Sequence, residues 1–94
     1  IVTKDEIEDV QNLNLELKLN GKLMQQGNTK SMIFDVYYLV SYLSYFMTLM
    51  PGDIITTGTP PGVGMGKKPQ IFLKSGDDIA LKIDKLGEQK QKVV

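Results

Sequence analysis

Apolar and polar residues alternate strictly from Leu13 to Leu19, which is the period of a strand with one buried face. Asn20-Gly21 follows directly, and this dipeptide is the strongest short-range signal for a two-residue β-hairpin. We expect the return strand over residues 22–26. A type I′ turn pairs Leu17 with Met24 and Leu19 with Lys22 across the hairpin and so fixes its register.

Helical spacing replaces this alternation between Val36 and Met50, where apolar residues recur every three or four positions. Asp35 is suited to cap the first turn of this helix, and Pro51-Gly52 is suited to end it. Four tyrosines surround the apolar face and favour a core or a protein–protein contact over a stacking platform. They are Tyr37, Tyr38, Tyr42 and Tyr45.

The second half of the chain predicts three further strands. Residues 54–57 form a short run with two β-branched isoleucines, which is typical of a buried strand. The turn Ser75-Gly76-Asp77 leads into an alternating strand over residues 79–83. A last strand is expected over residues 88–94. The pattern therefore indicates a mostly β fold with one main helix, an α+β class.

Composition narrows the possible partners and compartments. The chain has 94 residues, which is one domain or part of one, and its 11 basic and 11 acidic residues cancel. A zero net charge argues against binding nucleic acid or an anionic membrane surface. Cysteine and histidine are absent, so thiolate and imidazole chemistry must come from elsewhere, and we expect a reducing, cytoplasmic location. No apolar run approaches the ~20 residues of a transmembrane helix.

The start of the sequence is informative as well. Ile1-Val2-Thr3-Lys4 is neither a signal peptide nor an initiator methionine, so we expect a portion of a longer protein. Thr3 and Glu6 have the spacing of a capping box, which predicts a short helical turn.

A loop rich in glycine, threonine and proline is the strongest candidate for a site. It spans residues 58–70 after the predicted strand at 54–57. Glycines let a ligand approach the backbone closely, and threonine hydroxyls can donate and accept. Gly62-x-Gly64-x-Gly66 has neither the phosphate-loop nor the dinucleotide-binding spacing. A site for a small oxygenated substrate and a tight, close-packed turn remain the two interpretations, and we favour the first.

Charged residues give weaker signals. Glu6-Ile7-Glu8 pairs two carboxylates, but residues two apart on a helical turn do not face each other, so an exposed turn is favoured over a metal site. Asp53, Asp77 and Asp78 stand at turn positions, where aspartate is favoured for backbone hydrogen bonds. No set of three well-placed acids is evident. The lysines are interpreted as a solvated face, namely Lys67, Lys68, Lys74, Lys85, Lys90 and Lys92.

Three segments, taken in order, resemble the C-terminal part of the fumarylacetoacetate hydrolase superfamily. The resemblance covers essentially the whole chain. The segments are Gln25-Gln26-Gly27-Asn28-Thr29-Lys30-Ser31-Met32-Ile33-Phe34, the helix leading to Phe46-Met47-Thr48-Leu49, and Pro51-Gly52-Asp53-Ile54-Ile55-x-Thr57-Gly58-Thr59-Pro60-x-Gly62-Val63-Gly64.

The resemblance implies a fold and a chemistry. The fold is a rolled mixed β-sheet, incomplete in these residues, with residues 1–94 as the C-terminal portion of a single catalytic domain. Family members are commonly homodimers and use Mg²⁺, Mn²⁺ or Ca²⁺ to bind 2-oxo or 2-hydroxy acids. They hydrolyse acylpyruvates, decarboxylate oxo-acids or isomerise dienes through a metal-stabilised enolate.

The site residues implied are few. Thr59 is placed to contact the substrate carboxylate, and Gly58 to allow its close approach. The metal carboxylates, the catalytic lysine and the lid lie upstream in the family, so no catalytic or metal-binding residue is assigned to this chain, which we expect to be inactive alone. The alternative interpretation is a non-catalytic, β-rich fragment or interaction module.

Overall fold

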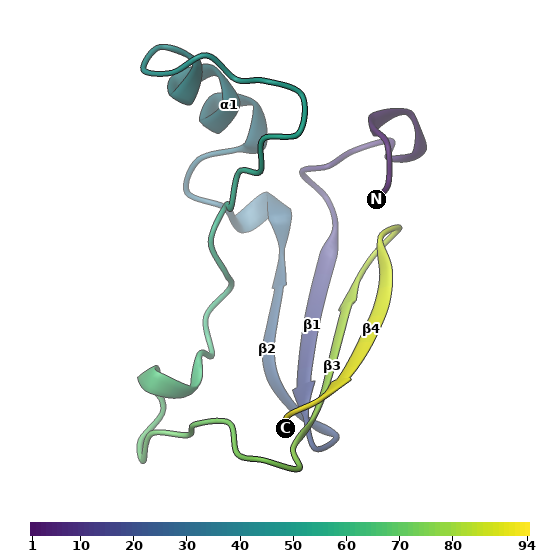
Figure 1. Cartoon of the computed structure of the whole chain (residues 1–94), viewed down its shortest axis with the longest axis vertical. Helices are drawn as coiled ribbons and strands as arrows, with labels where there is room; N and C mark the ends of the chain where they lie inside the picture. Colours follow the sequence, from purple (N-terminus) through teal and green to yellow (C-terminus); the bar gives the residue numbers. More distant parts are fainter.

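The computed structural model describes all 94 residues, and its central element is a four-stranded sheet. The strands are β1 (Asn14–Leu19), β2 (Lys22–Asn28), β3 (Asp78–Ile83) and β4 (Gly87–Lys92). They lie in the order β2-β1-β3-β4 with every pair antiparallel, so the first and last hairpins of the chain join through β1 and β3 (Figure 1). A single α-helix, α1 (Val36–Ser44), lies beyond one end of the sheet.

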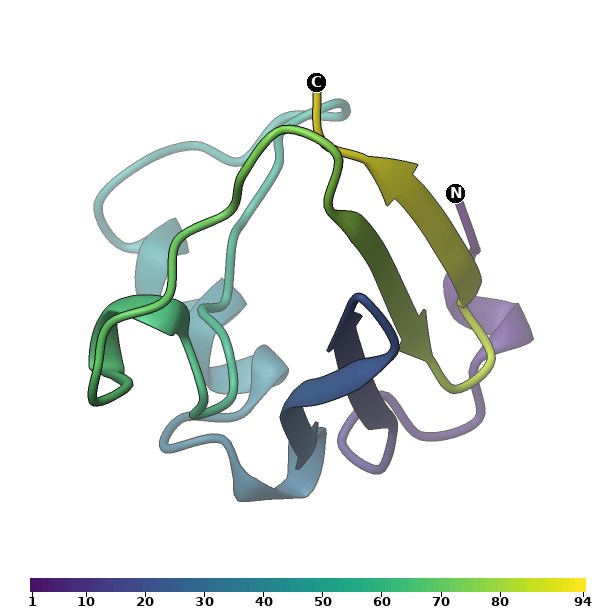
Figure 2. The same ribbon diagram turned by 90° about the horizontal axis from the view of Figure 1, so that it is seen from below.

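The predicted class, mostly β with one main helix, is confirmed. The sheet is not closed: seen from below, its strands form one side of an arc and residues 45–75 form the other (Figure 2). Short 3₁₀ turns occur at Lys4–Glu6, Thr29–Ser31 and Gly64–Gly66. The first is the predicted capping turn, in which the Glu6 carboxylate accepts from the Thr3 N–H at 2.9 Å.

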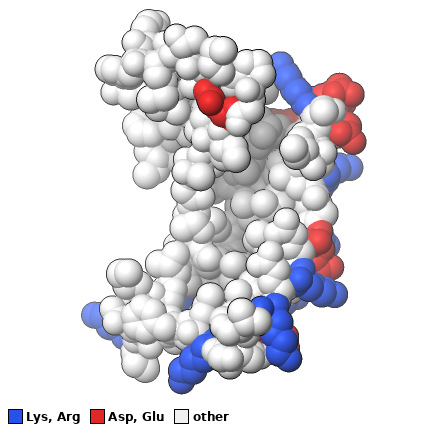
Figure 3. All heavy atoms as spheres, viewed as in Figure 1, with Lys and Arg blue, Asp and Glu red and all other residues white.

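The two faces of the sheet differ in chemistry. Leu15, Leu17 and Leu19 of β1 stand opposite apolar residues of β3, so the concave face is apolar. The alternate positions carry charge, as in the ion pair between Lys18 and Glu16 at 2.8 Å. Charged side chains accordingly gather along the outside of the molecule, while the hollow between the sheet and residues 45–75 is uncharged (Figure 3). Leu13, at 5% exposure, is the one buried residue of the chain.

The Asn20-Gly21 hairpin forms as predicted, and the predicted pairing of Leu19 with Lys22 is confirmed, but the predicted pairing of Leu17 with Met24 is wrong. Asn20 and Gly21 have φ of 50° and 77°, the pair of positive values that a type I′ turn requires. Leu17 stands opposite Gln25 instead of Met24, because the register shifts between Leu17 and Lys18 and leaves Met24 as an extra residue in β2. This β-bulge was not visible in the alternation, and β2 also extends two residues further than expected, to Asn28.

The helix begins where predicted and ends earlier. The Asp35 carboxylate accepts from the Tyr38 N–H at 2.6 Å, which confirms the N-cap. The helix ends at Ser44 and does not reach Met50. Asp53 explains part of this difference: its carboxylate accepts from the Met50 N–H at 2.8 Å, so that backbone donor serves the following turn and not a helix.

The predicted strand at residues 54–57 does not form. This segment pairs with no other strand, and the Ile54 side chain is 89% exposed. Strand propensity favours an extended backbone here but provides no partner for its hydrogen bonds. The other strands are confirmed with small changes: β3 begins one residue early, and β4 covers Gly87–Lys92 in place of residues 88–94.

Candidate functional site

Residues 58–62 lie against β2, and Gln25 makes the polar part of this contact. The Gln25 Nε2 atom donates to the Thr59 Oγ1 atom at 2.7 Å and to the Pro60 carbonyl oxygen at 2.6 Å. Gln25 is half-buried, whereas Thr59 is exposed. The loop predicted as a site is therefore fixed at its threonine, with one side of that threonine open.

Glycines on both partners allow this close approach. Gly62 has a φ of 114°, and a Cβ added there would overlap the Met24 carbonyl oxygen. A Cβ at Gly27 would lie 2.8 Å from the Pro60 Cβ. Since real Cβ atoms do not approach other atoms so closely, glycine is required at both positions for the loop to lie on β2. Gly58 also has a positive φ of 86° but has open space beside it.

A cavity of about 210 Å³ lies between this loop and the concave face of the sheet. Its walls are mostly apolar, and Gln25 is the polar side chain among them. The lining residues are Leu17, Leu19, Met24, Gln25, Gly62, Val63, Gly64, Ile71, Leu73 and Ile79. Thr59 is not among them; the contacts that hold it come from Gln25.

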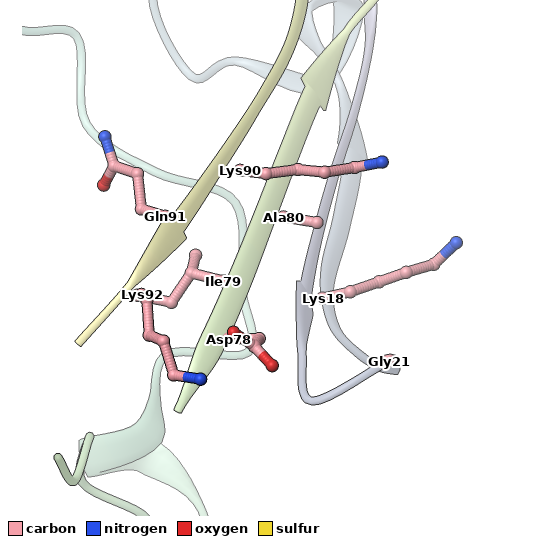
Figure 4. Close-up of a pocket in the computed structure, with 8 residues that line it drawn as sticks. All are labelled: Lys18, Gly21, Asp78, Ile79, Ala80, Lys90, Gln91 and Lys92. Carbon is pink, nitrogen blue, oxygen red and sulfur yellow. The ribbon is translucent and has the colours of Figure 1, made fainter. Parts of the chain in front are cut away.

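A second, shallower groove of about 350 Å³ lies on the other side of the sheet (Figure 4). Lys18 and Lys90 extend from it in the same direction, while Ile79 and Gln91 point the opposite way. Lys90 is exposed and Lys18 is half-buried, and both lie beside acids of their own strands, as in the contact of Lys90 with Glu88 at 3.6 Å. The groove is a solvated surface, which agrees with the sequence interpretation of the lysines.

Two of the three aspartates, Asp53 and Asp77, accept backbone hydrogen bonds at turns as predicted, whereas the Asp78 carboxylate makes none and the residue begins β3. Asp77 accepts from the Asn20 Nδ2 atom and from the Lys74 N–H, both at 2.8 Å, and so joins the two hairpin ends. These bonds, with the Asn20 amide the larger cause, hold the pKa of Asp77 below its usual range. Asp78 donates its own N–H to the Asn20 side chain at 2.9 Å.

Metal-ligating side chains do not gather anywhere in the chain. No group of three or more Asp or Glu residues is placed to hold an ion. Glu6 is engaged by Thr3, whose N–H and hydroxyl donate to it and hold the pKa of its carboxyl below the usual range. These 94 residues therefore do not by themselves fit a divalent cation with carboxylate ligands.

The comparison with known families agrees with this geometry. The family described as fumarylacetoacetate (FAA) hydrolase C-terminal matches residues 1–94. The chain belongs to this family. The predicted resemblance and the predicted fold type are both confirmed, because the same family appears among proteins of similar sequence and of similar structure.

Individual relatives include hydrolases and isomerases. A 2,4-didehydro-3-deoxy-L-rhamnonate hydrolase of Sphingomonas sp. (strain SKA58) is 58% identical over 94 residues, covering 99% of this chain and 33% of the relative. Maleylpyruvate hydrolase from Sphingobium sp. SYK-6, solved with manganese(II) and pyruvate, has a TM-score of 0.89 at 39% identity and matches 100% of this chain and 33% of its own. 5-carboxymethyl-2-hydroxymuconate delta-isomerase from Mycobacterium smegmatis has a TM-score of 0.83 at 34% identity, and the match covers 100% of this chain and 34% of the isomerase.

The chain thus spans about one third of the length of the curated relatives that it matches. Its family relationship is with enzymes that act on small organic acids, as their names state. The helix is not long and apolar enough to cross a membrane.

Gln25 is the contact that the sequence analysis missed. It lies in the polar part of the return strand of the hairpin, and nothing in its spacing distinguishes it from Gln26 beside it. Only the bulge at Met24 places Gln25 on the face that meets the loop, and the alternation of residues along the chain does not reveal that bulge.

Proposed function

We propose that these 94 residues are the C-terminal portion of a catalytic domain that acts on acylpyruvates or related 2-oxo and 2-hydroxy acids. Hydrolysis of a C–C bond, decarboxylation and diene isomerisation are the reactions considered. The hydrolases among the relatives favour hydrolysis. The observation that carries the proposal is the loop at Gly58 and Thr59, which the sheet supports from behind and whose hydroxyl stays exposed.

In this proposal the chain supplies one wall of the site. The Thr59 hydroxyl donates to a substrate carboxylate. Gly58 tolerates its positive φ and has no side chain that would obstruct the substrate. A hydrogen bond to a charged group contributes about 1.5–3 kcal/mol, enough to orient a small acid.

A divalent cation, Mg²⁺ or Mn²⁺, is part of the proposal but not of this chain. The manganese-bound maleylpyruvate hydrolase supports such an ion. Because no acidic cluster occurs among these residues, we assign its ligands to the remainder of the protein. No chemical step is assigned to the residues described here.

We further propose a cytoplasmic homodimer. The absence of cysteine suits a reducing compartment. Phe34, Tyr38, Tyr42 and Phe46 form a continuous aromatic row along α1, with neighbouring ring centroids 4.9, 5.9 and 5.1 Å apart. All four are exposed in this chain, and aromatic surfaces of this kind are enriched at interfaces. Sedimentation of the full-length protein tests the oligomeric state, and a monomer would contradict it.

Substitution of Thr59 tests the site in the full-length protein. We expect Thr59→Val to raise KM for an acylpyruvate about tenfold or more, because the carboxylate loses a charge-assisted donor. Thr56→Val is the matched control, since Thr56 is exposed on the same segment and makes no side-chain hydrogen bond. Unchanged kinetics in Thr59→Val would remove Thr59 from the site.

A further inference from the structure

The Gln25 side-chain amide acts on the loop only as a donor. Its two partners are the Thr59 Oγ1 atom at 2.7 Å and the Pro60 carbonyl oxygen at 2.6 Å. A carbonyl oxygen can only accept, so the nitrogen of the amide, and not its oxygen, must face the loop. The two hydrogens of that nitrogen are then both used.

This arrangement decides what the Thr59 hydroxyl can offer. Its oxygen already accepts from Gln25, and its own hydrogen has no acceptor among the 94 residues. A hydroxyl in this state presents a donor to an incoming group. The loop therefore offers a free hydroxyl donor to an anionic oxygen, such as a carboxylate.

The bulge at Met24 brings Gln25 to this position. Residues directly opposite each other in an antiparallel pair share a face of the sheet. Gln25 stands opposite Leu17, on the concave face, and Gln26 stands opposite Glu16, on the outer face. Without the extra residue, Met24 would take the place opposite Leu17 and Gln25 would move to the outer face.

We infer that Gln25 is a positioning residue, which holds Thr59 with its hydroxyl directed as a donor toward the carboxylate of the substrate. The inference rests on the proposed function. Gln25 touches neither the substrate nor a metal; it acts through Thr59 and Pro60.

Gln25→Glu in the full-length protein distinguishes a positioning role from a purely structural one, because only a positioning role predicts substrate binding that depends on pH in the variant. A protonated glutamic acid can still donate to the loop, whereas the carboxylate cannot and instead accepts the Thr59 hydrogen. The side chains that line the cavity with Gln25 carry no titratable group, so the substituted residue is the one that titrates there. Its half-buried place among oxygen acceptors favours the neutral form and moves its titration upward into the accessible pH range.

The affinity for oxalate is measured by calorimetry at a fixed Mn²⁺ concentration, and KM for an acylpyruvate is measured in parallel, at pH 5 and pH 8. As the pH rises between these values, we expect the oxalate affinity of the variant to fall about tenfold and its KM to rise about tenfold, relative to the unsubstituted protein. Gln26→Glu is the matched control: it makes the same charge change on the next residue, which is exposed on the outer face, and we expect no such dependence.

The outcomes separate the two proposals. If Thr59→Val weakens oxalate binding but Gln25→Glu behaves as the unsubstituted protein at both pH values, the positioning inference is overturned and the proposed function stands. If neither variant changes oxalate affinity, both are overturned.

A further variant applies if melting shows that Gln25→Glu does not fold. Gln25→Met keeps the length of the side chain and removes its donors. We expect it to raise KM about tenfold at every pH with kcat nearly unchanged. An unchanged KM would overturn the inference.

Discussion

The sheet and the segment between α1 and β3 are organised in opposite ways. Each strand of the sheet pairs with a neighbour, with Met24 the one interruption in β2, and both β1 and β3 pair on two sides. Residues 45–75 contain no strand and one 3₁₀ turn, and they meet the sheet through a few contacts with β2. Most of the exposed large apolar side chains of the molecule lie on this segment and on α1.

This difference shows which contacts fix the position of the loop in the candidate site. The sheet obtains its shape from repeated backbone hydrogen bonds, so no single side chain decides it. The position of the loop depends on a handful of contacts, in which single atoms matter. Substitutions at the loop should therefore change binding with little change of the sheet, and substitutions in the hairpins should do the reverse.

The largest effect is expected at Gly62. Gly62→Ala adds a Cβ that overlaps the Met24 carbonyl oxygen and also strains a backbone at φ 114°. The loop must move away from β2, and a displacement of about 1 Å can cost about 100-fold in kcat/KM. Steady-state kinetics and circular dichroism of the full-length protein measure the loss of activity and the retention of the sheet. At the control Gly66→Ala, the added Cβ meets only Val63 at 3.8 Å, so kcat/KM should stay nearly unchanged. Normal activity in Gly62→Ala would show that the loop does not depend on this contact.

A smaller effect, of the opposite kind, is expected at the hairpin turn. Gly21→Ala places a side chain at φ 77° without any clash, so the cost is the left-handed backbone alone, about 1–2 kcal/mol. Urea unfolding of the full-length protein should show this loss while kcat/KM is retained. Lys85→Gly is the converse control, because Lys85 already has a φ of 63°; relief of strain and added chain entropy oppose each other there, and stability should change by less than about 0.5 kcal/mol. A loss of activity in Gly21→Ala would mean that the turn and the loop are coupled.

The smallest effect concerns pH. The folded pKa of Asp77 lies below its unfolded value, so its carboxylate stabilises the fold fully above the unfolded pKa, and this contribution is lost as the pH falls through the folded pKa. Asp77→Asn should flatten the acid limb of a plot of melting temperature against pH. Asn20→Gly should do the same, since it removes the amide that is the main cause of the shift while tolerating the positive φ. Identical acid limbs in all three proteins would contradict this.

The sequence predicted correctly the features that depend on neighbouring residues and failed for those that depend on partners further along the chain. Asn20-Gly21 and the Asp35 cap depend on neighbouring residues, and both were predicted correctly. The strand at residues 54–57 was wrong because a strand requires a partner, and propensity does not provide one. The helix was predicted too long, and part of the difference arises because the Asp53 carboxylate accepts from the Met50 N–H, a competition that apolar periodicity does not contain.

The candidate site shows the same limit. Thr59 was selected through the family resemblance, and its role in substrate binding stays a prediction. Gln25 was not selected, because its importance arises from a bulge in the pairing of β2 with β1 and from a contact with a loop more than thirty residues later. No local pattern distinguishes Gln25 from Gln26, whereas the strand pairing places them on opposite faces of the sheet.

The bulge also makes the number of residues between the turn and Gln25 significant. From Gly21 onward, Gln25 is placed by counting: with the bulge kept, loss of one residue would present Gln26 to the loop, and gain of one residue would present Met24. In the part of the 58–70 loop that is exposed and does not contact β2, the number of residues fixes no such contact. Long surface loops also tolerate changes in length. Among family members, insertions and deletions should therefore be frequent in the far part of that loop and rare between Gly21 and Gln25.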